Sequence, residues 1–325
     1  MTPFERALRQ RISAEGAITV EAYMCACNDH YYATRDPLGA AGDFTTAPEI
    51  SQLFGEMVGA ALADCWKQAG APAGAVYAEL GPGRGTLAAD ALRVLRRSGF
   101  EGKVHLVETS PALRAEQRRL VPDAVWHNTI AELPDVPLFL IANEFLDALP
   151  VRQFIGGVER RVMISGDGLG FDRDGDIVEQ SPARDDSVRA IADKLVQSGG
   201  AAVLIDYGHA RTSPGDTLQA VRGHAFALVL ADPGEQDLTA HVDFGAVAGV
   251  ARKAGAAVST LATQREWLGR LGIAERGARL AAGNPQRAED IEAALDRLTE
   301  SAAMGDLFKV IALHSPGWPK PAGFA

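Results

Sequence analysis

The length and charge of the chain set the first limits on its function. Its 325 residues allow two structural units, or one α/β domain with insertions. The formal net charge of −10 disfavours a nucleic-acid partner, and no run approaches the ~18 apolar residues that membrane insertion requires.

The N-terminal region, residues 1–70, is predicted to be helical. Residues 1–16 indicate an amphipathic helix, because no apolar stretch typical of a signal peptide follows its arginines. A longer helix is expected over residues 47–66, with Thr46 and Glu49 placed as a capping box. The preceding loop, rich in Gly, Asp and Thr, is a candidate lid. We therefore expect a cap of residues 1–70 on a main domain of residues 71–325.

The three cysteines do not indicate a metal or disulfide framework. Cys25, Cys27 and Cys65 form neither a CxxC pair nor a ligand set with nearby histidines. Neither a structural metal nor disulfide bonds are predicted, and a reducing cytoplasm is the expected compartment.

The rest of the chain alternates β-like runs with helical stretches. The runs lie at residues 75–80, 103–108, 138–143, 201–208, 256–261 and 307–315, and the helical stretches at 86–98, 111–120, 144–149 and 264–271. This alternation is typical of a parallel, doubly wound sheet, which binds ligands at the carboxyl ends of its strands. Two insertions are expected, β-hairpins at about residues 151–185 and helices at about residues 272–303.

A glycine-rich turn joins the first run to its helix. In ELGPGRGTL, Gly81, Gly83 and Gly85 allow a sharp turn that brings the backbone close to a ligand. The lysine of a P-loop is absent, and Thr86 stands where a dinucleotide fingerprint needs glycine or alanine. With Glu79 the pattern is E-x-G-x-G-x-G, which resembles the S-adenosyl-L-methionine turn of doubly wound methyltransferases.

Polar side chains near this turn fit the same ligand. Glu79 would repel a pyrophosphate but tolerates a cationic sulfonium. Glu108 ends the next run, where a carboxylate accepts hydrogen bonds from ribose hydroxyls. Dehydrogenases also place a carboxylate there, so Glu108 indicates an adenosine ribose and not the chemistry. Asn128 and Thr129 are candidates for contacts with adenine, and they are equally good turn residues.

A second polar group is expected after the run 138–143. Asn143 and Glu144 close it, and Asp147 lies on the same face if a helical turn begins there. Paired carboxylates suit a cationic acceptor, and a guanidinium fits best because its planar fork can be held bidentately. Helix capping by Asn143 and Asp147 explains the spacing equally well. Further polar residues at strand ends are Asp206, His209, His241 and Asp243.

Eight stretches, in order from about residue 35 to residue 310, resemble the MidA-like family, whose mitochondrial relatives are arginine methyltransferases that assemble respiratory complex I. Among them are RDPLGAAGDFTTAPEISQLFGE, ELGPGRGTL, IANEFLDALPVRQF and PGEQDLTAHVDF. The resemblance implies a class I methyltransferase fold, with a mostly parallel, doubly wound sheet of seven strands, and S-adenosyl-L-methionine as cofactor. By position it implies cofactor contacts from Gly81, Gly83, Gly85 and Glu108, and an acceptor site bordered by Asp43, Asn143 and Glu144.

The resemblance further implies methylation of an arginine in a protein client, which in the relatives is the complex I subunit near the quinone site. In this hypothesis Glu144, helped by Asp147, holds the guanidinium, and Asp43 and His241 are further catalytic candidates. The chain starts almost directly at its domain, as expected of a bacterial, cytoplasmic member; a eukaryotic member would act in the mitochondrial matrix. The alternatives are an assembly chaperone that only binds the cofactor, a methyltransferase of small molecules or RNA and, last because of Thr86, an oxidoreductase.

Overall fold

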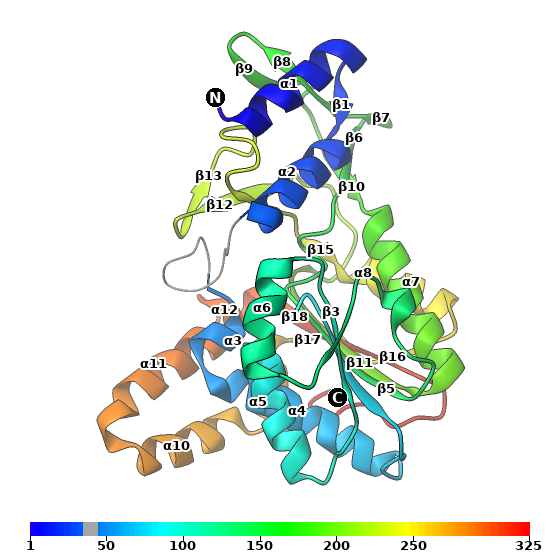
Figure 1. Cartoon of the computed structure of the whole chain (residues 1–325), viewed down its shortest axis with the longest axis vertical. Helices are drawn as coiled ribbons and strands as arrows, with labels where there is room; N and C mark the ends of the chain where they lie inside the picture. The colour runs from blue at the N-terminus through cyan, green and yellow to red at the C-terminus, as the bar shows by residue number, and fades with distance from the viewer. Residues whose placement is uncertain (35–44) are drawn as a thin grey trace.

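The computed structural model describes residues 1–34 and 45–325 (Figure 1). The chain forms a large lower layer around a central sheet and a smaller upper layer of helices and short strands. Most of the predicted lid loop, including Asp43, lies outside the described residues. Within the described ranges, no helix combines the length and the apolar character needed to cross a bilayer.

The lower layer is built on a mixed, mostly parallel sheet with the strand order β16-β18-β11-β5-β2-β3-β4. Its parallel strands are β2 (Val76–Leu80), β3 (Val104–Val107), β4 (Val125–His127), β5 (Leu138–Asn143) and β11 (Gly200–His209). β18 (Phe308–His314) runs antiparallel to β11 and to β16 (Ala257–Val258), and two short strands, β15 (Val242–Asp243) and β17 (Ala262–Thr263), pair at its margins. The predicted α/β fold is confirmed, with seven strands along this path.

Helices cover both faces of the sheet because its strands are apolar on both faces. In β2, Tyr77 packs into one core cluster while Val76 and Ala78 pack into another on the opposite face. The first face is covered by α4 (Gln52–Gln68), α5 (Thr86–Arg97) and α9 (Gln264–Arg270), and the second by α7 (Pro182–Ser198) and α8 (Phe244–Lys253). The sheet is therefore buried between two helical layers.

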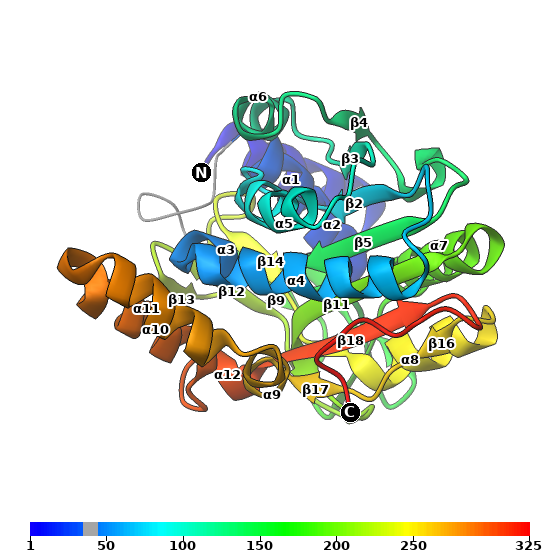
Figure 2. The same ribbon diagram turned by 90° about the horizontal axis from the view of Figure 1, so that it is seen from below.

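Other helices lie at the margin of the lower layer. They are α6 (Pro111–Leu120), α10 (Ile273–Gly283), α11 (Ala288–Thr299) and the short α12 (Met304–Leu307). Figure 2 shows α10 and α11 projecting from one side of the molecule. These two helices occupy the region where a helical insertion was expected.

The upper layer is assembled from three separate parts of the chain. Its helices are α1 (Pro3–Glu15) and α2 (Val20–Thr34), and its strands are β1 (Ile18–Thr19), β6 (Arg152–Ile155), β7 (Val158–Glu159), β8 (Arg161–Ser165), β9 (Gly168–Phe171), β10 (Ile177–Gln180), β12 (Gln219–Arg222), β13 (Ala225–Ala227) and β14 (Asp237–Thr239). One core cluster joins Tyr23, Val162 and Leu238, one residue from each part. The third part, residues 219–239, was not predicted.

The helix expected over residues 47–66 is broken, so the prediction of one continuous helix was wrong. The chain forms α3 (Ala47–Ile50) and α4, separated at Ser51, where the backbone is extended. Ser51 caps α4 by accepting a hydrogen bond from the Leu53 amide at 3.2 Å. The capping box was also wrong, because Thr46 makes no side-chain cap and Glu49 accepts a hydrogen bond from Thr86 Oγ1 at 2.6 Å.

Candidate functional site

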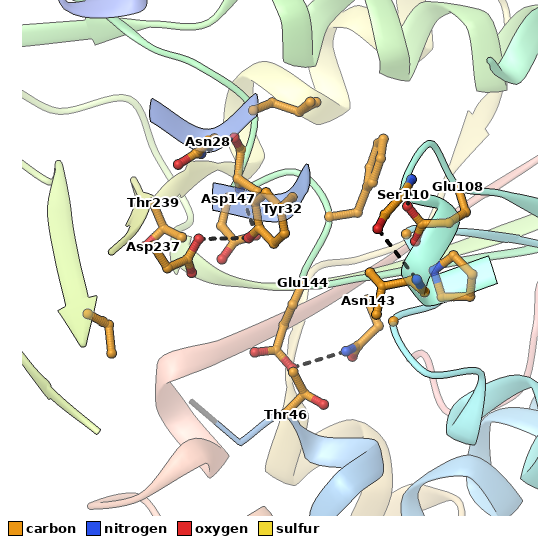
Figure 3. A pocket seen from close by; sticks show the side chains of 18 of the residues that line it. Asn28, Tyr32, Thr46, Glu108, Ser110, Asn143, Glu144, Asp147, Asp237 and Thr239 are labelled. Atoms are coloured by element: carbon orange, nitrogen blue, oxygen red, sulfur yellow. Dashed lines mark hydrogen bonds between the residues drawn. The ribbon is translucent and has the colours of Figure 1, made fainter. Parts of the chain in front are cut away.

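A cavity of about 700 Å³ lies at the carboxyl ends of β2, β3 and β5, where it is walled by both layers (Figure 3). The lower layer contributes Glu79, Gly81, Gly83, Glu108, Asn143, Glu144 and Asp147, and the upper layer contributes Asn28, Tyr32, Asp237 and Thr239. Its size is within the range of pockets for small molecules and cofactors. The position is the one that a doubly wound sheet favours for a ligand.

The glycine turn between β2 and α5 forms one wall of this cavity. Gly81, Gly83 and Gly85 have φ values of 58°, 53° and 90°, a left-handed conformation that side chains rarely adopt. A Cβ on Gly81 would lie 3.1 Å from the Phe145 ring. Gly81 and Gly83 line the cavity, whereas Gly85 packs against Gln117 and begins α5. The turn therefore presents its backbone directly to a ligand.

Glu108, at the end of β3, is a fixed carboxylate on the cavity wall. Its Oε1 accepts a hydrogen bond from the Ser110 amide at 2.8 Å, and its Oε2 accepts one from Gln117 Nε2 at 3.3 Å. Burial raises the pKa of Glu108 above its usual range. Because a carboxylate has about four acceptor positions, both oxygens retain capacity for ribose hydroxyls.

Glu79 lies behind the turn and is almost fully buried, with 2% of its surface exposed. It accepts a hydrogen bond from the Tyr77 hydroxyl, and burial raises its pKa to about 8. A cation in the cavity would favour the charged form of Glu79. The cationic sulfonium of S-adenosyl-L-methionine suits this environment.

Asn128 and Thr129, the predicted adenine contacts, do not line the cavity. Asn128 Oδ1 accepts a hydrogen bond from Arg114 Nη2 at 2.9 Å, and Thr129 Oγ1 donates to Glu132 at 3.2 Å. Both side chains stabilise the turn after β4, as their turn-residue alternative predicted. Residues not singled out from the sequence, Thr109, Ser110, Pro111 and Leu113, line the cavity instead. The Ser-Pro start of α6 was the signal that could have found them.

The chain after β5 forms a tight turn, so the predicted helix at residues 144–149 was wrong. Glu144 has φ 49°, which is uncommon for a residue other than glycine and marks backbone strain. Its amide donates to the Ile205 carbonyl at 2.9 Å. Asp206 Oδ2 accepts hydrogen bonds from the Leu146 and Asp147 amides at 3.0 and 3.2 Å. These tertiary bonds replace the helical ones and hold Glu144 at the cavity.

The turn brings two of the predicted acidic residues to one wall. Glu144 Oε1 accepts hydrogen bonds from Asn143 Nδ2 at 3.1 Å and from the Ala47 amide at 3.4 Å (Figure 3). The pKa of Glu144 is raised to about 8, chiefly by burial and next by the charge of Asp147. Burial also raises the pKa of Asp147, against a hydrogen bond from Tyr207. Both carboxyl groups line the cavity, which gives it an acidic wall.

Asn143 carries an unsatisfied acceptor beside Glu144. The residue is 8% exposed, and within the described part of the chain its Oδ1 has no hydrogen-bond partner. Buried polar atoms are nearly always paired, so this oxygen is placed to accept an N–H from a ligand in the cavity. The amino and adenine N–H groups of S-adenosyl-L-methionine are such donors.

Arg184 anchors this wall, although nothing in the sequence pattern pointed to it. The side chain extends from α7 and is 6% exposed. Its guanidinium donates to the carbonyls of Leu146, Asp147, Ala240 and His241 at 2.7, 3.2, 2.7 and 2.7 Å. Arg184 therefore ties the turn after β5 to the loop after β14. Its acceptors are all backbone atoms, which leave no mark in the sequence.

The remaining candidate site residues lie in different parts of the structure. His241 lines the cavity, its ring packs edge-on against Tyr207, and burial lowers its pKa. Asp243 caps α8 through the Ala246 amide. Asp43 lies outside the described residues. Across residues 1–34 and 45–325, no group of His, Cys, Asp and Glu residues is arranged to hold a metal ion.

Comparisons with known proteins agree with this geometry. Residues 57–168 and 160–262 match a family described as S-adenosyl-L-methionine-dependent methyltransferases. The mitochondrial protein arginine methyltransferase NDUFAF7 homolog of Drosophila melanogaster is 33% identical over 95% of this chain and 84% of its own length. NDUFAF7 of Homo sapiens, also named a mitochondrial protein arginine methyltransferase, is 32% identical over 96% of this chain and 83% of its own length.

A solved structure from Burkholderia thailandensis, bound to S-adenosyl-homocysteine, superposes on this chain with a TM-score of 0.86 and 29% sequence identity. The match covers 98% of this chain and 93% of that one. The demethylated product of the cofactor is thus bound by a protein that shares the whole fold. The chain belongs to the family of S-adenosyl-L-methionine-dependent methyltransferases.

Proposed function

We propose that this enzyme methylates a guanidinium nitrogen of an arginine in a protein client. The observation that carries the proposal is the wall on which Glu144 and Asp147 lie together beside the glycine turn. Such a wall suits a cationic, planar acceptor. The names of the relatives support it, because NDUFAF7 is called a protein arginine methyltransferase.

The mouth of the cavity supports an acceptor that belongs to a protein. Phe226, on β13, and Leu307, at the end of α12, both line the cavity and are 81% and 46% exposed. The cavity thus opens between apolar side chains at the surface. An arginine on a protein segment can extend into it while the segment stays outside.

The residues of the wall suggest how the reaction is assisted. S-adenosyl-L-methionine supplies an electrophilic methyl group on a positively charged sulfur. The glycine turn and Glu108 hold the cofactor, and Glu144 orients the guanidinium so that one nitrogen faces that methyl group. The carboxylate of Glu144 draws the positive charge of the guanidinium toward the nitrogens that lie farther from the methyl group. Glu144 is also placed to accept the proton that leaves the methylated nitrogen.

The client is proposed to be a subunit of respiratory complex I, the one near its quinone site. This proposal rests on the resemblance of the chain to the MidA-like family. The reaction would then take place in a bacterial cytoplasm or, in a eukaryote, in the mitochondrial matrix. Mass spectrometry of arginine methylation in cells with and without the protein tests it, and a methylated arginine lost in the deletion strain identifies the client.

Substitution of Glu144 tests the mechanism. Glu144→Gln keeps the shape of the side chain and removes its charge, so S-adenosyl-homocysteine affinity should change less than ~3-fold while methyl transfer falls ~100-fold or more. Transfer is measured with labelled cofactor and an extract of the deletion strain as acceptor. Glu101→Gln, an exposed position before β3, is the matched control.

Two outcomes of this experiment contradict different parts of the proposal. Full activity of Glu144→Gln would remove Glu144 from the mechanism. A wild-type protein that binds the cofactor but labels no protein would favour an assembly chaperone without methyl transfer.

A further inference from the structure

The upper layer contributes an acidic residue to the acceptor half of the cavity. Asp237, on β14, is 4% exposed and lines the cavity. Tyr32, on α2, donates its hydroxyl to Asp237 Oδ1 at 2.7 Å. In Figure 3 the pair of Tyr32 and Asp237 lies next to Asp147, and Glu144 lies nearer to Thr46. The acidic wall of the lower layer therefore continues into a carboxylate of the upper layer.

The carboxylates of Glu144 and Asp237 influence each other electrostatically. The negative charge of Asp237 contributes to the raised pKa of Glu144, and that of Asp147 contributes more. Such repulsion is significant only over short separations in a partly desolvated site. A cation bound between Glu144 and Asp237 would relieve it.

Positive charge from the described residues of the cavity does not neutralise this group. Among the described residues that line the cavity, Arg84 is the sole arginine or lysine, and it lies 3.8 Å from Glu49. Arg184 lies behind the wall and donates to backbone carbonyls. His241 has a lowered pKa, so it is neutral at pH 7. The acceptor half of the cavity is therefore electrostatically suited to a cation.

Two further features match a ligand with several N–H groups. The unpartnered Oδ1 of Asn143, buried beside Glu144, is an acceptor that lies on the same wall. The aromatic rings of Tyr32, Tyr207 and Phe308 also line the cavity. Aromatic faces attract guanidinium cations and stack on their planes.

We infer that Asp237, oriented by the Tyr32 hydroxyl, is a specificity-determining residue that holds the acceptor guanidinium together with Glu144. The inference rests on the proposed function and deepens it. A guanidinium carries N–H groups on more than one edge of a plane, so carboxylates from the two layers can bind it together. An ammonium is a compact point charge and gains less from this arrangement. The site therefore selects arginine over lysine, and it is complete only where the two layers meet.

The test uses the full chain saturated with S-adenosyl-homocysteine and two probes, N-acetyl-arginine amide and N-acetyl-lysine amide. Binding is measured by ligand-observed NMR titration. The wild type should bind the arginine probe ~10-fold more tightly than the lysine probe. Asp237→Asn should lower affinity for the arginine probe ~10-fold and reduce the discrimination, while affinity for S-adenosyl-homocysteine stays within ~2-fold.

Two other variants complete the experiment. Tyr32→Phe removes only the hydroxyl that orients Asp237, and it should lower the affinity for the arginine probe ~3-fold. Asp232→Asn is the matched control, because Asp232 is an exposed aspartate of the same segment that pairs with Arg222. If Asp237→Asn fails to fold, as judged by S-adenosyl-homocysteine binding, Tyr32→Phe decides the question.

The outcomes separate this inference from the proposed function. If Glu144→Gln abolishes arginine binding while Asp237→Asn and Tyr32→Phe bind both probes like the wild type, the role of Asp237 is refuted and the arginine acceptor stands. If the wild type binds lysine as well as arginine, or binds neither, arginine selectivity itself is refuted. A loss of arginine binding in the Asp237 and Tyr32 variants that the Asp232→Asn control does not share supports the inference.

Discussion

Burial gives two acidic residues of the cavity an unusual affinity for protons. Glu79 and Glu144 each have a pKa of about 8, chiefly because desolvation disfavours the charged carboxylate. Near neutral pH each is therefore mostly protonated in the ligand-free protein. Protonation lowers the cost of placing several carboxylates in one cavity. A bound cation reverses this balance and favours the charged forms.

The ligand-free protein is expected to lose stability as the pH rises from about 5 to 8. The pKa of Glu79 is about 8 in the folded state against a usual 4.5, so the folded state binds more protons between these values and the free energy of unfolding falls with rising pH. For Glu79 the loss is up to ~4 kcal/mol. Urea denaturation at pH 5.5 and pH 8 measures it, and Glu79→Gln should reduce the difference. Equal differences in the two proteins would contradict the assignment.

At the scale of residues, the sequence could indicate those cavity residues whose position follows from the local sequence pattern. The glycine turn, Glu108 and the pair Glu144 and Asp147 could be predicted, because each follows directly from a strand end in a doubly wound sheet. Tyr32 and Asp237 could not, since they meet only through tertiary structure across 205 residues of sequence. No local pattern encodes such a contact.

At the scale of elements, the turn after β5 is the part of the fold on which the proposed acceptor site depends. Its left-handed residue, Glu144, is held in place by neighbours on other elements, Asp206 on β11 and Arg184 on α7. A strained conformation persists only when its surroundings determine it. Regular helices such as α6, Pro111–Leu120, matched their predicted bounds because capping and periodicity fix them locally. The turn was predicted as a helix because its hydrogen bonds are tertiary.

Removal of the Arg184 guanidinium should destabilise the protein strongly. Arg184→Met leaves four buried carbonyls without this donor, and the free energy of unfolding should fall by about 3–5 kcal/mol. Arg184→Lys should retain only part of the stability that Arg184→Met loses, because an ammonium cannot reproduce the planar fork of a guanidinium. Urea denaturation measures both. Arg189→Met is the control, because Arg189 lies on the same helix and makes an exposed ion pair with Asp186. If Arg189→Met lowered the free energy of unfolding as much as Arg184→Met, the stabilising role of the Arg184 hydrogen bonds would be contradicted.

At the scale of the whole molecule, the cavity exists because two layers meet over the sheet. Asn28, on α2, donates to the carbonyl of Ala148 below it and to that of Leu238 within the upper layer. The sheet and its helices could be predicted from alternating runs. The upper layer could not be predicted as a unit, because its small sheets have short strands and its core joins distant parts of the chain.

The net charge of −10 should act on the encounter with a basic client. For a synthetic arginine peptide of net charge about +3, kcat/KM for methyl transfer should fall ~3- to 10-fold between ~20 and ~300 mM salt, while kcat changes little. Salt screens the long-range attraction that accelerates association. A neutral peptide with the same central arginine is the control. Equal salt dependence of the two peptides would contradict the steering of the client by charge.

The three-part origin of the upper layer has a consequence for biosynthesis. Helices α1 and α2 leave the ribosome before their partners on β14, which follow about 200 residues later; at ~5–20 residues per second this means ~10–40 s. During that interval Tyr23, Met24 and Cys27, all fully buried in the finished fold, have nothing to pack against from that strand. Apolar side chains of α2 are therefore open to aggregation and proteolysis until β14 has been synthesised.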